Sequence, residues 1–445
     1  MNRPIHSQIT YIPPSALKPY AGNARTHNRR QIRQIAASIQ KFGFVNPVLI
    51  YEDNRTIAGH GRVEAAKLIE MQEVPTLLIS AMTEAEKRAY VIADNRLAEK
   101  AGWDRKILAI ELQALVDLDF EVELTGFDMG EIDLILDDAR EAQDPAGSPD
   151  DDVPDLPRTA VTRRGEMWLL GDHRLLCGDS RSAAAYDILM DGALARLIVT
   201  DPPYNVRIEG NVSGLGAVRH REFAMASGEM SPGEFQVFLE TVFGHLAGVS
   251  VDGALHFHCM DWRHMGEMLA AGRSAYSELK NLVVWSKTNG GMGSLYRSQH
   301  ELIFVWKSGT AAHVNNVELG RHGRNRSNVW TYPGVNTFKA GRLDELAAHP
   351  TVKPIAMIAD AIKDCSHRGD IVLDPFCGSG TILIAAEKTG RKARAIEFEP
   401  GYVDVAIRRW EKFTGRPAVL EATGETFEDV EMQRADELSA ETVEA

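Results

Sequence analysis

The feature that most constrains the fold of this 445-residue chain is a glycine-rich segment between an apolar run and a helix-like stretch. The apolar run at residues 371–373 leads into Asp374-Pro375-Phe376-Cys377-Gly378-Ser379-Gly380-Thr381, and residues 382–387 continue with a helix-like pattern. Glycines at such a junction let the backbone turn from a strand into a helix and approach a ligand closely. The segment therefore predicts a strand–turn–helix unit with a ligand at the strand end.

Two further observations bear on that ligand. The third glycine of a dinucleotide fingerprint would fall at Leu383, which disfavours NAD. Residues 393–397 are typical of a second strand that ends in Glu397, 17 residues after Gly380, where a carboxylate is well placed to accept from a ribose hydroxyl. Taken alone, Glu397 is more readily explained as a solvated strand end.

A second strand-end motif, Asp201-Pro202-Pro203-Tyr204, closes the apolar run at residues 195–200. A carboxylate and a backbone carbonyl can each accept one N–H of an exocyclic amino group, while an aromatic ring stacks on a base rotated out of the duplex. Proline keeps its carbonyl and lacks a competing N–H. The same residues can meet by chance at a strand-to-turn junction, but the glycine-rich segment further along favours the functional interpretation.

Together the two motifs resemble the amino-group DNA methyltransferases that use S-adenosylmethionine. Cys177-Gly178-Asp179-Ser180, His349-Pro350-Thr351-Val352-Lys353-Pro354, Trp285-Ser286-Lys287 and Arg297-Ser298-Gln299-His300-Glu301 also match family segments, so the resemblance covers roughly residues 161–415. The catalytic motif precedes the cofactor motif, as in the beta group of that family. The resemblance implies catalytic roles for Asp201, Pro202, Pro203 and Tyr204. It implies cofactor binding by Asp179, Lys353, Asp374, Phe376, Gly378, Ser379, Gly380, Thr381 and Glu397.

In the implied mechanism the target base is flipped out, Tyr204 stacks on it, and Asp201 with the Pro202 carbonyl accepts its amino hydrogens. The amine then attacks the sulfonium methyl carbon in line. A carboxylate with a pKa near ~4 is too weak a base to deprotonate a neutral aromatic amine first. Asp201 is therefore expected to stabilise the positive charge that develops on nitrogen, and no metal is required.

The net charge of −14 is confined to two segments. Residues 141–157 carry six acids and no base, and residues 419–445 carry nine acids and Arg434 alone as a base. Segments that are rich in charge and poor in apolar residues do not form a packed core. We therefore expect an acidic flexible linker at 141–157 and an acidic disordered tail at 419–445.

Basic charge is concentrated elsewhere. Residues 1–51 hold seven Lys or Arg and no acid, and a second cluster combines His313 and His322 with Arg321, Arg324 and Arg326. Basic side chains displace the counterions of DNA phosphates, so these arginines are candidate DNA-binding residues, although solvated faces explain either cluster equally well. The target-recognition segment is expected at about residues 308–345.

The N-terminal region has the pattern of a separate α+β unit. A helix is expected at 31–42 with Gly43 as its stop, a hairpin at 48–51 and 56–58, a helix opened by Gly59-His60-Gly61-Arg62, and a strand at 74–79. From Thr83, which forms a capping-box pattern with Glu86, the chain reads as helical to about residue 139. This layout resembles the ParB/sulfiredoxin-like nuclease-type domain over residues 1–80, with a helical extension to about 140.

In ParB proteins the turn at this position grips nucleotide phosphates, so the resemblance implies a nucleotide or phosphate site at Gly59, Gly61 and Arg62. His60 stands where the family usually has glutamate, and Gly61 replaces a second arginine, which puts nucleotide hydrolysis in doubt. The alternative is a glycine turn that serves packing alone, in a module that only docks DNA.

The sequence thus predicts a doubly wound, Rossmann-like α/β methyltransferase domain at 158–418, preceded by a ParB-like α+β domain at 1–140. No apolar stretch approaches the ~20 residues that span a bilayer, and residues 1–8 lack a signal-peptide core, so a cytoplasmic protein is expected. The cysteines lack Cys-x-x-Cys spacing, which supports neither disulfides nor a metal site. The thiols concerned are Cys177, Cys259, Cys365 and Cys377.

The predicted function is methylation of adenine N6 in double-stranded DNA, because beta-group enzymes with aspartate at the first catalytic position are mostly adenine-specific. Three alternatives stay open: cytosine-N4 methylation of DNA, a ParB-like DNA-binding protein with an inactive methyltransferase half, and RNA or protein methylation on the same fold. A homodimer and a companion endonuclease of a restriction-modification system are also left open.

Overall fold

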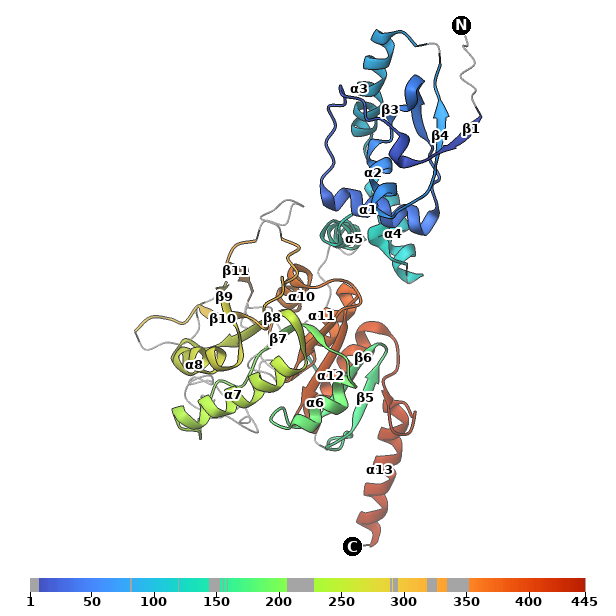
Figure 1. Ribbon diagram of the computed structural model, residues 1–445. Helices are drawn as coiled ribbons and strands as arrows, with labels where there is room; N and C mark the ends of the chain where they lie inside the picture. Colours follow the sequence, from blue (N-terminus) through green and yellow to red (C-terminus); the bar gives the residue numbers. More distant parts are fainter. Residues whose placement is uncertain are drawn as a thin grey trace. The chain divides into compact units, whose positions relative to one another are not determined.

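The computed structural model describes residues 8–80, 82–118, 120–143, 153–154, 156–157, 159–205, 228–288, 290, 295–317, 326–333 and 352–444. The chain divides into two compact units, Met1–Pro145 and Ala146–Ala445, called here the N-terminal and the C-terminal unit (Figure 1). The division falls within the segment that the charge pattern marks as a linker.

The N-terminal unit begins with a four-stranded sheet of order β1-β4-β2-β3. The expected hairpin is confirmed: β2 and β3 pair antiparallel around Asp53 and Asn54, which both have positive φ. The first expected helix is confirmed too, since the Asn28 side chain caps it and Gly43 ends it with φ 80°. The elements are β1 Ile9–Ile12, η1 Pro14–Ala16, α1 Arg29–Phe42, β2 Val48–Tyr51, η2 Glu52–Asn54, β3 Arg55–Ala58, α2 His60–Leu68 and β4 Val74–Leu78.

The helical extension of this unit consists of α3 Glu84–Lys100, α4 Arg105–Asp117, η3 Val122–Thr125 and α5 Met129–Gln143. The capping box at the start of α3 is confirmed, because the Thr83 hydroxyl accepts from the Glu86 N–H and the Glu86 carboxylate accepts from the Thr83 N–H. Helices α4 and α5 share a small core around Leu112, Ile132 and Leu136.

The C-terminal unit contains a ten-stranded sheet of order β11-β9-β10-β8-β7-β12-β13-β6-β5-β14. Its centre, from β6 through β13, β12 and β7 to β8, is parallel, whereas β10 pairs antiparallel with both β8 and β9. The predicted doubly wound α/β sheet is therefore confirmed. The strands are β5 Met167–Leu170, β6 His173–Cys177, β7 Ala195–Thr200, β8 Ser250–Met260, β9 Glu278–Lys287, β10 His300–Lys307, β11 Val329–Tyr332, β12 Ile371–Asp374, β13 Lys392–Glu397 and β14 Val419–Leu420.

Helices cover both faces of this sheet (Figure 1). Alternate residues of each strand point to opposite faces, so on β7 Leu197 and Val199 join the core on one side and Ile198 joins the core on the other. The first core contains residues of α10 Ile355–Cys365, α11 Thr381–Thr389 and α12 Pro400–Thr414. The second contains residues of α6 Ala183–Met190, α7 Pro232–Gly248 and α8 Met265–Ala275, the last preceded by η5 Trp262–His264.

The expectation of a disordered tail from residue 419 is wrong for the part of the tail that the structure describes. Strand β14 pairs with β5, and α13 Phe427–Glu444 follows it. Phe427 is 1% exposed and packs edge-on against Trp168, while Arg434 forms an ion pair with Glu166. The composition misled because a few apolar residues one helical turn apart anchor the segment, although most of its residues are acidic.

The cysteines, possible metal ligands and apolar helices were also considered in the sequence, and the structure describes them as follows. The four cysteines are free thiols, and Cys177, Cys259 and Cys377 are buried. No group of three or more His, Cys, Asp or Glu that could hold a metal ion occurs among the residues whose positions are given. In the same part of the chain, none of the helices combines the length and the apolar character needed to cross a bilayer.

Candidate active site

The sheet order brings four acidic residues to one edge. Strands β6, β13, β12 and β7 are parallel neighbours, so their carboxyl ends lie side by side. Asp179 follows β6, Glu397 ends β13, Asp374 ends β12, and Asp201 follows β7. Open α/β sheets bind ligands at this edge, and the structure therefore unites the two strand-end motifs in a single site.

The glycine turn between β12 and α11 has the backbone that the sequence predicts. Gly378 and Gly380 both have positive φ, at 53° and 86°. A Cβ at Gly380 would come within 2.8 Å of the Ala406 Cβ on α12, whereas a Cβ at Gly378 would meet nothing within 4 Å. Gly380 thus lets the helices pack, and the space beside Gly378 is open to a ligand.

Two carboxylates at this turn are well hydrogen-bonded, and Asp374 is buried while Glu397 is half-buried. Asp374 accepts from the Thr200 hydroxyl at 2.6 Å and from the Phe376 N–H at 3.0 Å, and burial raises its pKa to about 7. Glu397 accepts from the N–H groups of Gly378 (2.8 Å) and Glu399 (2.9 Å), and burial raises its pKa to about 6. Both of the Asp374 bonds reach Oδ1, so Oδ2 has none within the described residues. Acceptors of this kind suit a ligand that carries an ammonium group and hydroxyls.

Three other residues assigned to cofactor binding also have protein partners. The carbonyl and hydroxyl of Ser379 accept from Arg409 Nη1 at 2.7 and 3.0 Å, which ties the turn to α12. Asp179 pairs with the Arg181 guanidinium through bonds of 2.7–3.1 Å, and this pairing lowers the pKa of Asp179. The Phe376 ring lies 5.9 Å from that of Phe238. Thr381 is the first residue of α11.

Asp201 lies in a group of charged side chains in which Lys353 is buried and the others are half-buried. Its Oδ2 accepts from Lys353 Nζ at 2.5 Å, and its Oδ1 accepts from the Tyr204 hydroxyl at 2.6 Å. Lys353 Nζ also lies 3.1 Å from Glu301 Oε2, and Lys287 Nζ lies 2.5 Å from Glu301 Oε1. Two carboxylates are thus matched by two ammonium groups.

The charges in this group act on one another because they are partly shielded from water. Burial raises the pKa of Asp201, while the Lys353 ammonium opposes that effect. Burial would also raise the pKa of Glu301, but Lys353 and Lys287 together bring it down to about 2. Burial disfavours the charged form of Lys353, yet the two carboxylates raise its pKa overall. At neutral pH the paired charges explain how a lysine with a side chain 6% exposed is tolerated.

The sequence named the segments of Glu301 and Lys287 but gave neither residue a role. Because β10 runs antiparallel to β8, its second residue, Glu301, lies at the same edge as the carboxyl ends of the parallel strands. Lys287 ends β9, which reaches that edge from the other side of β10. Lys353 was expected to bind the cofactor, and in the structure its Nζ pairs with Asp201.

The predicted DNA-binding arginines are only partly described. Arg321 and Arg324 lie outside the described residues, as do 318–325 and 334–345 of the expected recognition segment. Arg326 pairs with Asp364 at 3.0 Å and Asp360 at 3.1 Å, and its guanidinium lies 4.8 Å from the Trp330 ring. These observed partners lie within the protein, and the contact of Arg326 with DNA phosphate stays a prediction.

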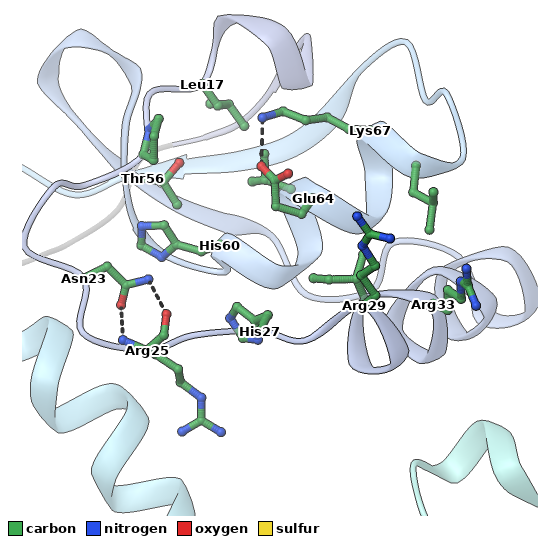
Figure 2. A pocket seen from close by; sticks show the side chains of 14 residues that line it. Leu17, Asn23, Arg25, His27, Arg29, Arg33, Thr56, His60, Glu64 and Lys67 are labelled. Carbon is green, nitrogen blue, oxygen red and sulfur yellow. Dashed lines mark hydrogen bonds and ion pairs between the residues drawn. The ribbon is translucent and has the colours of Figure 1, made fainter.

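A second candidate site is a cavity of about 770 Å³ in the N-terminal unit (Figure 2). Among the described residues that line it, Glu64 is the only acid, and it pairs with Lys67 at 2.8 Å. His60, the first residue of α2, faces the cavity, and burial lowers its pKa. The lining residues are Leu17, Pro19, Asn23, Arg25, His27, Arg29, Ile32, Arg33, Thr56, His60, Val63, Glu64, Lys67 and Leu68.

The residues predicted to grip phosphate lie beside this cavity rather than in its lining. Gly59 caps α2 with φ 95° and no side-chain bond, which leaves the first N–H groups of the helix without a side-chain cap. Gly61 is packed closely, since a Cβ there would lie 3.0 Å from Ile35 and 3.1 Å from His27. Arg62 reaches the Pro47 carbonyl at 3.4 Å. The positive charge comes instead from residues on the preceding loop and on α1.

Three family models match successive parts of the chain: ParB N-terminal domain at residues 3–95, ParB-methyltransferase HTH domain at 106–164, and DNA methylase, of the N6/N4 class, at 195–408. The chain is a ParB-like domain fused to an N6/N4 DNA methyltransferase. The large sheet is accordingly the S-adenosylmethionine-dependent methyltransferase fold, and the resemblances inferred from the motifs of both units are confirmed.

Individual curated relatives match only about a fifth of the chain each. The ParB-like nuclease domain-containing protein YnaK of Escherichia coli K12 is 48% identical over 81 residues, which are 18% of this chain and 93% of that protein. DNA adenine methyltransferase YhdJ of the same strain is 41% identical over 88 residues, 20% of this chain and 29% of YhdJ. The solved structure of TTHA0409 from Thermus thermophilus, complexed with S-adenosyl-L-methionine, is 22% identical with a TM-score of 0.37, covering 57% of this chain and 96% of that one.

Proposed function

We propose that the fusion protein transfers a methyl group from S-adenosylmethionine to the N6 amino group of adenine in double-stranded DNA, in the cytoplasm where that DNA lies. The observation that carries this proposal is the adjacency of the two motifs. Strands β7 and β12 pair in parallel, with Ile198 opposite Leu373, so Asp201 and Asp374 emerge from neighbouring strand ends. A target amine held by the first would meet a cofactor held by the second.

The residues at the glycine turn fit the cofactor. Asp374 would pair with its ammonium group, Glu397 would accept from the ribose hydroxyls, and the open space beside Gly378 would admit it close to the backbone. S-adenosylmethionine supplies an electrophilic methyl group when it is bound. Arg409 holds Ser379, and through it the shape of the turn, without contacting the ligand.

Asp201 would act on the target base. Its carboxylate accepts an N–H of the exocyclic amine, orients the nitrogen lone pair and stabilises the positive charge that develops on nitrogen. The Pro202 carbonyl would accept the second N–H. The Tyr204 hydroxyl fixes Oδ1 of Asp201, while its ring supplies the surface against which a flipped base can stack.

The preference for adenine rests on Asp201 at the first position of the motif and on the adenine specificity named for YhdJ, which this chain matches over part of its length. Cytosine N4 offers an amine of the same kind, so the test must separate the two bases. DNA incubated with the protein and isotopically labelled cofactor would be digested and its nucleosides analysed by mass spectrometry. N6-methyladenine is expected, N4-methylcytosine alone would contradict the base assignment, and no methylated base would contradict the activity.

We also propose that the N-terminal cavity binds a phosphate-bearing ligand such as a nucleotide, and that Gly59 and Gly61 shape the turn beside it. Support comes from the lining, in which Arg25, Arg29 and Arg33 are opposed by the single carboxylate of Glu64. A helix start without a side-chain cap adds N–H donors that favour anions. DNA is the second partner proposed for this unit, and a nucleotide and DNA can be told apart by titrating each separately.

A further inference from the structure

Both oxygens of Asp201 accept hydrogen bonds from within the protein. Lys353 donates to Oδ2 at 2.5 Å and Tyr204 donates to Oδ1 at 2.6 Å. An aromatic amine and an ammonium group are both N–H donors. An incoming target amine must therefore share a carboxylate oxygen of Asp201 with one of these donors, or replace that donor. Tyr204 lies three residues from Asp201 on the same turn, whereas Lys353 comes from a segment 152 residues away in sequence. Lys353 is the donor whose displacement leaves the catalytic turn intact.

Lys353 has a second acceptor to move to. Its Nζ lies 3.1 Å from Glu301 Oε2 and 3.3 Å from the Tyr204 hydroxyl. Glu301 is itself held by Lys287 through its other oxygen at 2.5 Å. A buried ammonium that lost its only partner would be strongly destabilised, but with Glu301 in place the charge stays paired.

We propose that Lys353 and Glu301 are positioning residues, an inference that rests on the proposed methyl transfer. Lys353 holds the Asp201 carboxylate ionised and aligned until the target amine takes over its hydrogen bond. Glu301 then retains the displaced ammonium group. The target amine is neutral, so the exchange adds no charge to the buried group. Neither residue needs to touch the base or the cofactor.

The two residues have opposite effects on the charge of Asp201. Burial raises the pKa of Asp201, Lys353 lowers it and Glu301 raises it. A close charge typically changes a pKa by about 1–3 units, so the effect of each residue on the pKa of Asp201 can be measured separately. Among the described residues, the titratable and charged groups that surround Asp201 are Lys353 before α10, Glu301 on β10, Lys287 on β9, Asp374 on β12, Cys259 on β8 and Tyr204 on its own turn.

The test measures the single-turnover rate of methyl transfer against pH, at saturating cofactor and DNA, for the full-length wild type, Lys353→Met and Glu301→Gln. The acid limb of the profile should move up by about one pH unit or more in Lys353→Met and down by a similar amount in Glu301→Gln. The plateau rate should fall by about tenfold or more in both variants, since a poorly positioned group costs roughly that much. Lys353→Arg, which keeps the charge, should restore the acid limb.

The matched controls are Lys280→Met and Glu278→Gln, which remove an exposed ion pair of 3.0 Å from the other end of β9 and should leave the profile unchanged. Cofactor affinity, measured by calorimetry, should stay within about twofold of the wild type in every variant, because neither residue contacts the glycine turn.

Acid limbs that stay in place or move in the same direction would overturn the inference. So would a large loss of cofactor affinity in Lys353→Met with an unmoved limb, because Lys353 would then serve the cofactor. If Lys353→Met does not fold, the downward shift in the nearly isosteric Glu301→Gln decides alone. A wild type that methylates neither base would contradict the proposed function instead.

Discussion

The two units turn from a strand into a helix through nearly the same backbone. Gly59 before α2 has φ 95° and ψ 21°, and Gly380 before α11 has φ 86° and ψ 22°. Neither glycine offers a side chain that could cap its helix, so both turns bring uncapped N–H groups to the surface of a candidate site. The backbone conformation of the turn is the same in both units, although the proposed ligands differ.

The difference lies in the charges that other segments bring to the turn. Asp374 and Glu397 flank the turn in the C-terminal unit, whereas arginines of the first loop and of α1 line the cavity beside the turn in the N-terminal unit. Acceptors suit a ligand with an ammonium group and hydroxyls, and cations suit phosphates. The backbone of a strand–glycine–helix turn thus makes a ligand site, and residues remote in sequence select the ligand.

The largest effect is expected for Asp201→Ala. Loss of the group that stabilises developing charge should slow methyl transfer at least about a hundredfold, while cofactor affinity stays nearly constant because Asp201 does not contact the glycine turn. Single-turnover rates and calorimetry separate the two quantities. Asp187→Ala, at an exposed position of α6, is the control. A rate within about tenfold of the wild type would remove Asp201 from the mechanism.

The similarity of the two turn backbones can be tested by changing Gly59 and Gly380 to alanine. At Gly380 the new Cβ would meet Ala406 at 2.8 Å, so left-handed strain and overlap together should cost about 3 kcal/mol. At Gly59 the nearest atoms, at 2.9 Å, are the mobile end of the Arg62 side chain, and only about 1 kcal/mol is expected. Hydrogen exchange at α11 and α2 measures each cost. Equal losses of stability would show that the positive φ value alone sets the cost of alanine at both positions.

The charge comparison is sharpened by removing three cations from the cavity. Arg25, Arg29 and Arg33, each changed to Gln, should raise the dissociation constant of inorganic triphosphate about thirtyfold, at ~0.7 kcal/mol for each partly exposed charge pair. Arg88, Arg105 and Lys106 changed to Gln remove the same charge from α3 and α4, outside the cavity lining. Equal losses of affinity in both triple variants would argue for a diffuse surface effect. Calorimetry at constant salt gives both values.

The smallest expected effect is on pH dependence. Burial raises the pKa of Asp374 to about 7, so its carboxylate is ionised above that pH and protonated below it. Only the ionised form attracts the ammonium of S-adenosylmethionine. Cofactor affinity should therefore be constant above about pH 8 and fall roughly fivefold between pH 7 and pH 6. Asp374→Asn should bind weakly at every pH, and a wild-type affinity that does not change on acidification would place the ammonium elsewhere.

The secondary-structure elements that could be predicted are those determined by residues close together in sequence. The hairpin of β2 and β3 depends on two apolar runs and the turn between them, and the capping box at Thr83 and Glu86 depends on residues three apart. Both strand-end motifs were found for the same reason, because an apolar run followed by an acid or a glycine can be recognised within ten residues. Helix α13 was missed, since its residues Phe427 and Arg434 are held by Trp168 and Glu166, more than 250 residues away.

By itself the sequence determined that the chain has an α+β unit that resembles ParB and an α/β unit that resembles a DNA methyltransferase, and which acids end the strands of the larger sheet. Only the tertiary structure decided which charges surround those acids. Glu301 reaches Asp201 because β10 runs antiparallel and begins where its neighbours end, and Lys353 arrives from before α10. Likewise, the arginines of α1 come to line the same cavity as His60 only when the N-terminal unit folds. Backbone turns follow local steric preferences, whereas buried charges must find partners wherever the fold brings them.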